Sequence, residues 1–282
     1  MKPSITGRRS ELASILAQQR APSAIENIHI NLAGQQANTL LHDGHAWKDF
    51  ARLALAGTRR AIRSAVADRA PMLVHASFAF VHSVEHGARL AEPLRSSLDA
   101  ILECEALALS APVPACVVRL GYLYGPQSAD LRAYRAAFRL GRPYWSGPPK
   151  ALQYHLHQLD AASALLAAAR PRNAGKIFYA TDGLPVSFMR LMDAFAHRVG
   201  RRTPLHLPLR SKTWARLIIR EEHMQQAALA MPNLAPTPRV PGRKPKYPDY
   251  QAGLDQIIEA WSAKEIPDGL RRIPAMDIPI AE

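Results

Sequence analysis

The chain has 282 residues, of which 48% are hydrophobic and 21% charged, so it has enough apolar side chains for one large folded unit and wholesale disorder is excluded. The formal net charge of +13 favours anionic partners. The two cysteines, Cys104 and Cys116, are too few for a disulfide framework, which is typical of a cytoplasmic protein. The basic N-terminus has no apolar segment behind it and no run of about 18 apolar residues occurs, so we expect neither a signal peptide nor a membrane span.

The first half of the sequence alternates between helical and strand patterns. Apolar residues recur at helical spacing in the longer segments, whereas the shorter ones are continuous apolar runs that end in small residues. In chain order we expect a helix over 11–20, a strand over 25–34, a helix over 46–70, a strand over 72–80, a helix over 92–109 and a strand over 114–125. Such alternation predicts an α/β fold, a Rossmann-like parallel sheet with crossover helices.

The alternation weakens after residue 126. We expect helices over 131–142, 160–171 and 186–200, a strand over 176–183, and a proline-rich remainder with one helix around 212–230. This pattern predicts a small mixed C-terminal cap over the ends of the sheet. We therefore divide the chain into a partial Rossmann-like domain at 1–126 and, at 127–282, the remainder of the sheet with a substrate or cap region, the two forming one continuous domain.

Several segments carry motifs whose order along the chain is informative. They are INLAG (30–34), LALAGTRRAIRSA (53–65), VRLGYLYGP (118–126), HQLDAASALLAA (157–168) and YPDYQAGLDQII (247–258). The series resembles the extended short-chain dehydrogenase/reductases, the NAD-dependent epimerase/dehydratase family. The resemblance implies NAD or NADP as the cofactor and a nucleotide-sugar-like substrate. It also implies cofactor contacts by Ala33, Gly34, Ser77, Gly121 and Tyr122, and substrate contacts by Tyr124, Arg135 and Arg142.

The Gly-rich fingerprint of this family is absent. In such folds a G-x-x-G-x-x-G turn and a helix N-terminus hold the cofactor pyrophosphate, but ITGRR (5–9) has a single glycine. We therefore expect the chain to open near the helix before the family's fourth strand, as an N-terminally truncated sheet that lacks the first βαβ unit. Binding of NAD or NADP is then doubtful, and a homodimer or a protein partner is expected to cover the exposed sheet edge.

The residues at the family's catalytic positions are apolar. The resemblance places a serine or threonine at Phe78, the tyrosine and lysine of Tyr-x-x-x-Lys at Leu94 and Leu98, and an asparagine at Ala54. In the family, the tyrosine transfers a proton, the lysine lowers the tyrosine pKa, and the serine orients the substrate oxygen. Leucine and phenylalanine can do none of this, and the only nearby substitutes are Ser77, His75 and His82.

Other polar clusters have both a structural and a functional interpretation. His155 and His157 share one face of an expected strand, which is a spacing found in metal ligands, but the family has a structural sequence there, so we predict no metal site. Arg132, Arg135, Arg139 and Arg142 recur on one side of an expected helix and suit either phosphate contacts or a solvated face. No recognised nucleic-acid module accompanies them, so neither a nucleic acid nor a membrane is an expected partner.

The sequence therefore favours an NAD(P)-dependent epimerase/dehydratase-family protein that is a pseudoenzyme and binds a nucleotide or nucleotide-sugar-like ligand. Two alternatives remain open. One is an active NAD(P)-dependent oxidoreductase or sugar-nucleotide epimerase that uses His75, His82 or Ser77 as substituted acid/base residues. The other is a non-catalytic scaffold or assembly subunit that docks its basic surface on an acidic partner.

Overall fold

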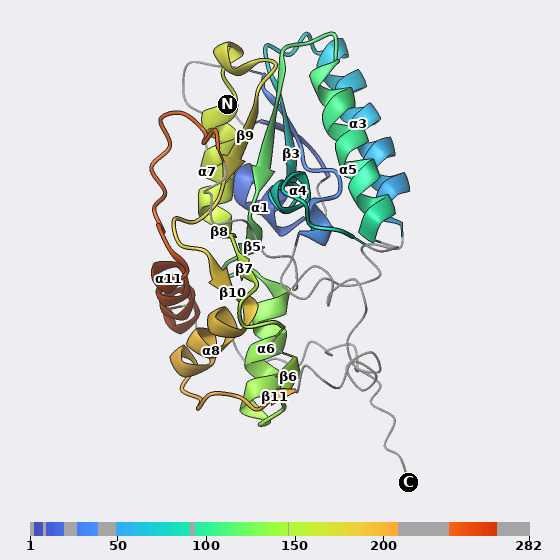
Figure 1. Cartoon of the computed structure of the whole chain (residues 1–282). Helices are drawn as coiled ribbons and strands as arrows, with labels where there is room; N and C mark the ends of the chain where they lie inside the picture. The colour runs from blue at the N-terminus through green and yellow to red at the C-terminus, as the bar shows by residue number, and fades with distance from the viewer. Residues whose placement is uncertain are drawn as a thin grey trace.

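A five-stranded parallel sheet forms the centre of the molecule (Figure 1). The computed structural model describes residues 3–7, 10–19, 27–38, 49–90, 94–145, 147–207 and 237–263. In spatial order the strands are β1 (Ser4–Thr6), β2 (His29–Asn31), β3 (Leu73–Phe78), β4 (Ala115–Leu120) and β9 (Ile177–Ala180). Every neighbouring pair is parallel, which confirms the predicted sheet.

The first strand was not predicted. Ser4, Ile5 and Thr6 pair with His29, Ile30 and Asn31 of β2, so a strand precedes the first helix. Three residues are too few to carry a periodic signal, and only the pairing identifies them as a strand. The central strands β3 and β4 are buried on both faces along their whole length, as expected where helices cover both sides of a parallel sheet.

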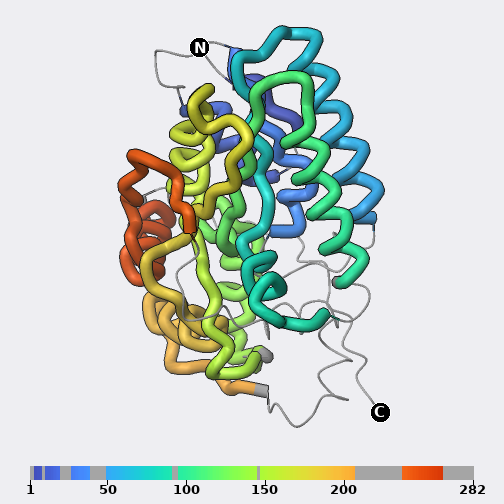
Figure 2. Tube along the Cα trace, turned by 45° about the horizontal axis from the view of Figure 1, so that its top comes forward, coloured from blue at the N-terminus to red at the C-terminus, as the bar shows by residue number. Residues whose placement is uncertain are grey.

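Two helical layers sandwich the sheet (Figures 1 and 2). Helices α1 (Glu11–Gln18) and α7 (Gln158–Ala168) cover one face, where Leu16 and Leu165 share a core cluster with Val74. Helices α3 (Phe50–Ala67) and α5 (Leu94–Leu109) lie side by side over the other face. Each layer buries the apolar stripe of its helices against the sheet, which gives the three-layer arrangement of α/β proteins.

A smaller group of elements follows the carboxyl ends of the strands and forms the cap in the lower half of Figure 1. It has three two-stranded pairs, and aromatic rings such as Phe138, Phe188 and Phe195 fill its core. The remaining elements are η1 (Gln35–Ala37), α4 (Val81–Glu85), β5 (Tyr122–Tyr124), α6 (Ala129–Arg139), β6 (Tyr144–Trp145), β7 (Leu152–Gln153), β8 (His155–His157), η2 (Pro171–Asn173), β10 (Val186–Ser187), α8 (Phe188–Arg198), β11 (His206–Leu207) and α11 (Tyr250–Ala263).

The predicted helices and strands agree with the observed ones to within a few residues wherever the chain is described. The helix expected around 212–230 lies outside the described residues. None of the described helices combines the length and the apolar composition that crossing a membrane requires.

Candidate functional site

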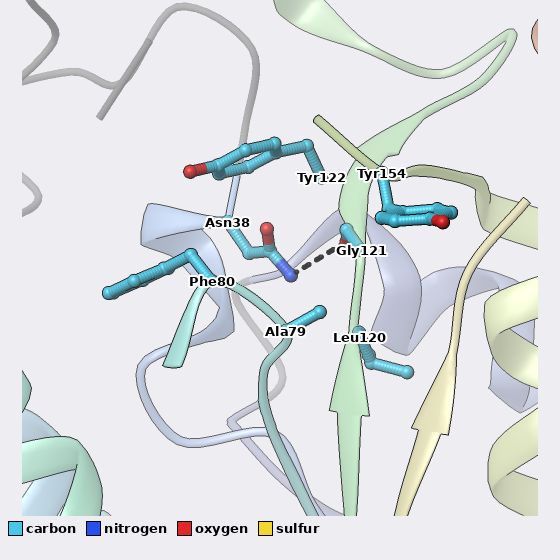
Figure 3. A pocket seen from close by; sticks show the side chains of 7 residues that line it. All are labelled: Asn38, Ala79, Phe80, Leu120, Gly121, Tyr122 and Tyr154. Carbon is cyan, nitrogen blue, oxygen red and sulfur yellow. Dashed lines mark hydrogen bonds between the residues drawn. The ribbon is translucent and has the colours of Figure 1, made fainter. Parts of the chain in front are cut away.

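A small cavity lies where β3 and β4 end (Figure 3). Its volume is about 10 Å³, roughly the space of one water molecule. Open α/β sheets bind their ligands in the crevice at the carboxyl ends of the strands, so this cavity is the candidate site. It is lined by Asn38, Ala79, Phe80, Leu120, Gly121, Tyr122 and Tyr154.

Hydrogen bonds fix the orientation of the Asn38 side chain in this cavity. Its Nδ2 donates to the Gln35 Oε1 atom at 3.1 Å and to the Gly121 carbonyl at 3.2 Å. The Gln35 Nε2 atom in turn donates to the carbonyls of Ala76 and Ser77, so the Gln35 amide cannot turn over. Asn38 is 1% exposed, and its Oδ1 atom has no hydrogen-bond partner within the described part of the chain.

Three of the four positions that the resemblance assigns to catalysis lie in one hydrophobic cluster. Ala54, Phe78 and Leu98 are all buried there, and the rings of Phe50 and Phe78 meet edge to face at 5.7 Å. Leu94 opens α5, but its side chain is not among those described. The packing around these residues is that of a protein core, with no polar group from this set pointing to the cavity.

A buried ion-pair network stands beside that cluster. Arg119 on β4 forms a two-pronged pair with Glu105 on α5, at 2.9 Å from Nε to Oε1 and 2.8 Å from Nη2 to Oε2. Its Nη1 atom donates to Glu85 and to the Tyr179 hydroxyl, and the Ser77 hydroxyl donates to Glu105. These bonds join α5 and α4 to the sheet.

The electrostatics of the network keep Arg119 charged. Burial by itself lowers the pKa of the guanidinium, but the hydrogen bonds and the charge of Glu105 outweigh burial and raise this pKa above its usual value. Burial also raises the pKa of Tyr179 to about 12, so its hydroxyl is protonated near neutral pH. A permanently charged arginine between carboxylates is suited to holding elements together rather than to moving protons.

The two histidines that the sequence offered as substitutes are engaged elsewhere. The His75 Nδ1 atom lies 2.8 Å from the Asn31 amide nitrogen beneath α3, and burial lowers the pKa of His75 to about 4. His82 lies on α4, with its ring against those of His86 and Tyr179 and its Nδ1 atom 3.8 Å from Glu85. Together with the Ser77 bond to Glu105, these contacts place all three substitutes in structural arrangements.

Apart from Ser77, whose hydroxyl donates to Glu105, the residues assigned to the cofactor divide into two groups. Gly121 and Tyr122 line the cavity. Ala33 donates its backbone N–H to the Asn31 side chain, and Gly34 has φ of +88° with the Phe50 ring 2.8 Å from where a Cβ would stand. The second group therefore shapes the turn after β2.

The residues assigned to substrate contacts are not brought together. The Tyr124 hydroxyl donates to Asp182 at 2.9 Å, the Arg135 guanidinium lies 5.2 Å above the Trp261 ring, and Arg142 is exposed beyond the end of α6. Burial raises the pKa of Asp182 to about 8. The hydrogen bond from Tyr124 opposes this rise, and the nearby charge of Asp160 adds to it. Tyr124 and Asp182 thus form a buried pair behind the cap.

No group of three or more His, Cys, Asp or Glu side chains within the described ranges is placed to hold a metal ion. His155 and His157, which share a strand face as expected, are both buried, and burial lowers their pKa values to about 3 and 4. His157 contacts Gln256 of α11 at 3.0 Å. His157 therefore belongs to the packing between β8 and α11.

Gly7 directly follows β1 and packs closely against β2. Gly7 has φ of +85°, and a Cβ there would stand 2.6 Å from the Leu32 carbonyl, so this glycine allows β1 and β2 to approach each other. Ser10 caps α1 by accepting from the Ala13 N–H. Glu11, in the first turn of α1, accepts from the Ala129 N–H at 2.8 Å and from the Gln158 amide.

Sequence reasoning missed Asn38, Gln35 and Tyr154. The available signal was the polar run GQQAN (34–38), which directly follows a strand that ends in small residues. Polar side chains in that position face the carboxyl edge of a parallel sheet. Only the folded chain shows that they meet the ends of β3 and β4.

Comparison with known proteins supports the fold. No protein-family model matches the sequence, and no curated protein matches it. Solved structures match over nearly the whole chain: the human epimerase family protein SDR39U1 with NADPH has a TM-score of 0.69 at 16% identity, covering 92% of this chain and 99% of that one. The Bordetella bronchiseptica enzyme WbmG with NAD and UDP has a TM-score of 0.64 at 14% identity, covering 93% and 94%.

UDP-glucose 4-epimerase from Thermotoga maritima with UDP-glucose has a TM-score of 0.61 at 12% identity, covering 94% of this chain and 100% of that one. The chain therefore has the Rossmann-like fold of the extended short-chain dehydrogenase/reductases. This agreement confirms the resemblance predicted from the sequence at the level of the fold.

Proposed function

We propose that this protein is a non-catalytic relative of the NAD(P)-dependent epimerases and dehydratases, which binds a nucleotide or nucleotide-sugar-like ligand at the carboxyl edge of its sheet. The observation that carries the proposal is the burial of Ala54, Phe78 and Leu98 in one hydrophobic cluster. Epimerisation or dehydration through a keto intermediate needs a proton-transferring group at the substrate hydroxyl. Loss of one general acid or base alone lowers a rate by about 10²–10⁴-fold. Among the described residues, none of the three substitutes Ser77, His75 and His82 lines the cavity.

The described residues do not fit a resident dinucleotide. A pyrophosphate needs free backbone N–H groups at the first helix N-terminus, whereas α1 has Ser10 as its cap and the acidic Glu11 in its first turn. The cavity at the ends of β3 and β4 has the volume of about one water molecule, far less than a nicotinamide ring. We therefore assign no reaction step to NAD or NADP, and the proposed ligand is one that places a small group in this cavity.

Two features support a nucleotide-like ligand. Proteins of the same fold were solved with NADPH, with NAD and UDP, and with UDP-glucose. The net charge of +13 favours anionic ligands over neutral or cationic ones at the level of the whole molecule.

Thermal unfolding of the whole chain tests the proposal, with NAD, NADH, NADP, NADPH, UDP and UDP-glucose as ligands. A ligand that binds only the native state, at ~100 times its dissociation constant, adds about 2.7 kcal/mol and raises the midpoint. We expect a shift with UDP or UDP-glucose, and no change of nicotinamide absorbance when NADH and a nucleotide sugar are mixed with the protein. Turnover of the nicotinamide would overturn the non-catalytic assignment. If no nucleotide shifts the midpoint, the proposal that the ligand is nucleotide-like is overturned.

A scaffold function is the second candidate, supported by the exposed side of α3. Arg52, Arg60 and Arg63 lie on it together with Leu53 and Val66, which are 44% and 40% exposed. A basic surface with apolar residues is suited to an acidic protein partner, and β1 is the outermost described strand of the sheet. Light scattering of the purified protein, alone and with a candidate partner, separates a monomer from a homodimer or a complex.

A further inference from the structure

We propose that the far end of the cap is a surface that docks on an anionic lipid membrane. This surface, called the cap tip, consists of residues 139–143, which lead into β6, and residues 200–205, which lead into β11. It shares no residue with the cavity at the ends of β3 and β4, so the inference goes beyond the proposed function and does not depend on it.

Strand pairing brings the two segments of the cap tip together. Strands β6 and β11 are parallel, and the Tyr144 N–H donates to the Leu205 carbonyl at 3.1 Å. Because paired parallel strands begin at the same edge, the residues that precede them lie side by side. Figures 1 and 2 both show the two segments at the lower end of the cap.

The cap tip carries the two most exposed large apolar side chains of the described residues. Leu205 is 73% exposed and Leu140 is 68% exposed. Single exposed apolar residues are ordinary on a protein surface, whereas two on adjoining segments form a patch. Such a patch favours contact with an apolar phase or partner.

The cap tip is convex. Gly141 and Gly200 have φ of +67° and +74°, which glycine adopts without strain in tight turns. A Cβ at either glycine would meet no heavy atom within 4 Å, so both turns project into solvent. A projecting surface is suited to entering the headgroup layer of a bilayer, whereas the recognition of a peptide helix uses a groove.

The charge around the two leucines has one sign. The segments RLGRP (139–143) and GRRTPL (200–205) contain arginines and no acidic residue. Arg142, Arg201 and Arg202 are exposed, and none of the three forms an ion pair within the described part of the chain. These guanidinium groups are therefore available to an external anion.

A carboxylate beneath the cap tip is engaged by the strands instead. The Asp193 Oδ1 atom of α8 accepts from the Tyr144 hydroxyl at 2.9 Å and lies 2.9 Å from the His206 Nε2 atom. These contacts hold β6 and β11 against α8. The cap tip thus stands on a fixed base whose acidic group is bound to the strands rather than to the arginines.

Anionic lipid matches both parts of this surface. Its phosphates pair with guanidinium groups, and its acyl chains receive the leucines at the boundary of the headgroup layer. A nucleic acid would pair with the arginines but leave the leucines in water. Attachment to a membrane surface needs no spanning segment, which is why a sequence without a long apolar run predicted no membrane partner.

Flotation of the whole chain with vesicles tests the proposal. We expect binding to an equimolar mixture of phosphatidylcholine and phosphatidylglycerol to be about 10-fold or more tighter than to phosphatidylcholine alone, and to weaken with added salt. Leu140→Ser/Leu205→Ser is expected to bind the mixed vesicles about 10-fold less tightly. Arg201→Gln/Arg202→Gln is expected to lose about 5-fold for each arginine.

Two matched variants away from the cap tip are expected to leave vesicle binding unchanged. Leu53→Ser/Leu102→Ser removes two leucines of α3 and α5 that are 44% and 40% exposed. Arg170→Gln/Arg172→Gln removes two exposed arginines at η2. Thermal unfolding without vesicles shows that each variant is folded, as expected for substitutions at exposed positions.

An absence of vesicle binding, equal binding to neutral and mixed vesicles, or full binding by folded Leu140→Ser/Leu205→Ser protein would overturn the proposal. Loss of binding in the arginine variant alone would identify a general anion site for a nucleic acid or an acidic protein, and would overturn the lipid as partner. Because the vesicles contain no nucleotide, these results are distinguishable from those of the nucleotide titrations.

Discussion

Two neighbouring polar regions at the carboxyl end of the sheet differ in how completely their hydrogen bonds are made. Around Arg119, three donor nitrogens meet Glu105, Glu85 and Tyr179, and the whole group joins helices to strands. At the cavity, the Asn38 nitrogen is equally well held, but its oxygen has no partner within the described residues. The difference teaches that a closed network supports the fold, whereas the other region leaves a buried acceptor without a hydrogen bond from a described residue.

Arg119→Met breaks the closed network and has the largest expected effect. Removing one partner leaves Glu105 as a buried charge without its counter-charge, which is expected to lower the free energy of unfolding by about 3–5 kcal/mol in urea titrations. Arg198→Met is the matched control, because Arg198 pairs with Asp255 on the surface and its loss is expected to cost about 0–1 kcal/mol. Equal effects of the two substitutions would contradict a supporting function of the network.

Leu98→Lys tests whether the cluster beside the network is a core. Leu98 is 7% exposed, so an ammonium group there is expected to lower the unfolding free energy by about 2–4 kcal/mol. Leu102→Lys, on the same helix and 40% exposed, is expected to change it by less than about 0.5 kcal/mol. Wild-type stability in Leu98→Lys would mean that this position can hold a catalytic lysine, against the proposed function.

Asp182→Asn extends the comparison to the buried pair behind the cap. The folded pKa of about 8 lies above the ordinary value of 3.8, so the native state binds this proton more tightly than the unfolded state. The contribution of protonated Asp182 to stability is fully present below pH 3.8, and it is lost as the pH rises toward 8. We therefore expect Asp182→Asn to gain stability relative to the wild type by up to about 1.4 kcal/mol per pH unit between about pH 5 and 8.

Urea unfolding at several pH values across that window measures the slope. Asp255→Asn, at an exposed carboxylate, is the control and is expected to follow the pH dependence of the wild type. A constant difference between Asp182→Asn and the wild type would show that Asp182 ionises at its ordinary pKa.

Ser77→Ala has the smallest expected effect on stability. It distinguishes a structural function of the Ser77 hydroxyl from a function in ligand binding. The hydroxyl donates to Glu105, which keeps its two bonds to Arg119, so the expected loss is about 1.5 kcal/mol of stability. Binding of UDP and UDP-glucose is expected to be unchanged, as measured by the same shifts of the thermal midpoint. A large loss of ligand affinity with full stability would assign Ser77 to the site instead.

The sequence predicted the elements that repeat a pattern over many residues. The long helices and the apolar strands β3 and β4 were predicted because burial of one helix stripe, or of both faces of a strand, imposes a period that local sequence must follow. Gly121 and Tyr122, which line the cavity, were named as cofactor contacts because the segment VRLGYLYGP resembles that of a known family. By contrast, no periodic sequence pattern marks β1, and none marks the hydrogen bonds of Asn38 to Gln35 and Gly121.

The sequence by itself determined the α/β architecture, the absence of a Gly-rich loop in ITGRR, and the apolar character of Ala54, Phe78, Leu94 and Leu98. Only the tertiary structure decided what those residues do. It packs Ala54, Phe78 and Leu98 into one core, joins Ser77 to Arg119 through Glu105, and joins Asn38 to Gly121 at the cavity. The physical reason is that periodicity follows from local geometry, whereas a hydrogen bond or a cavity depends on residues far apart in sequence, such as Asn38 and Gly121, whose distance is set by folding.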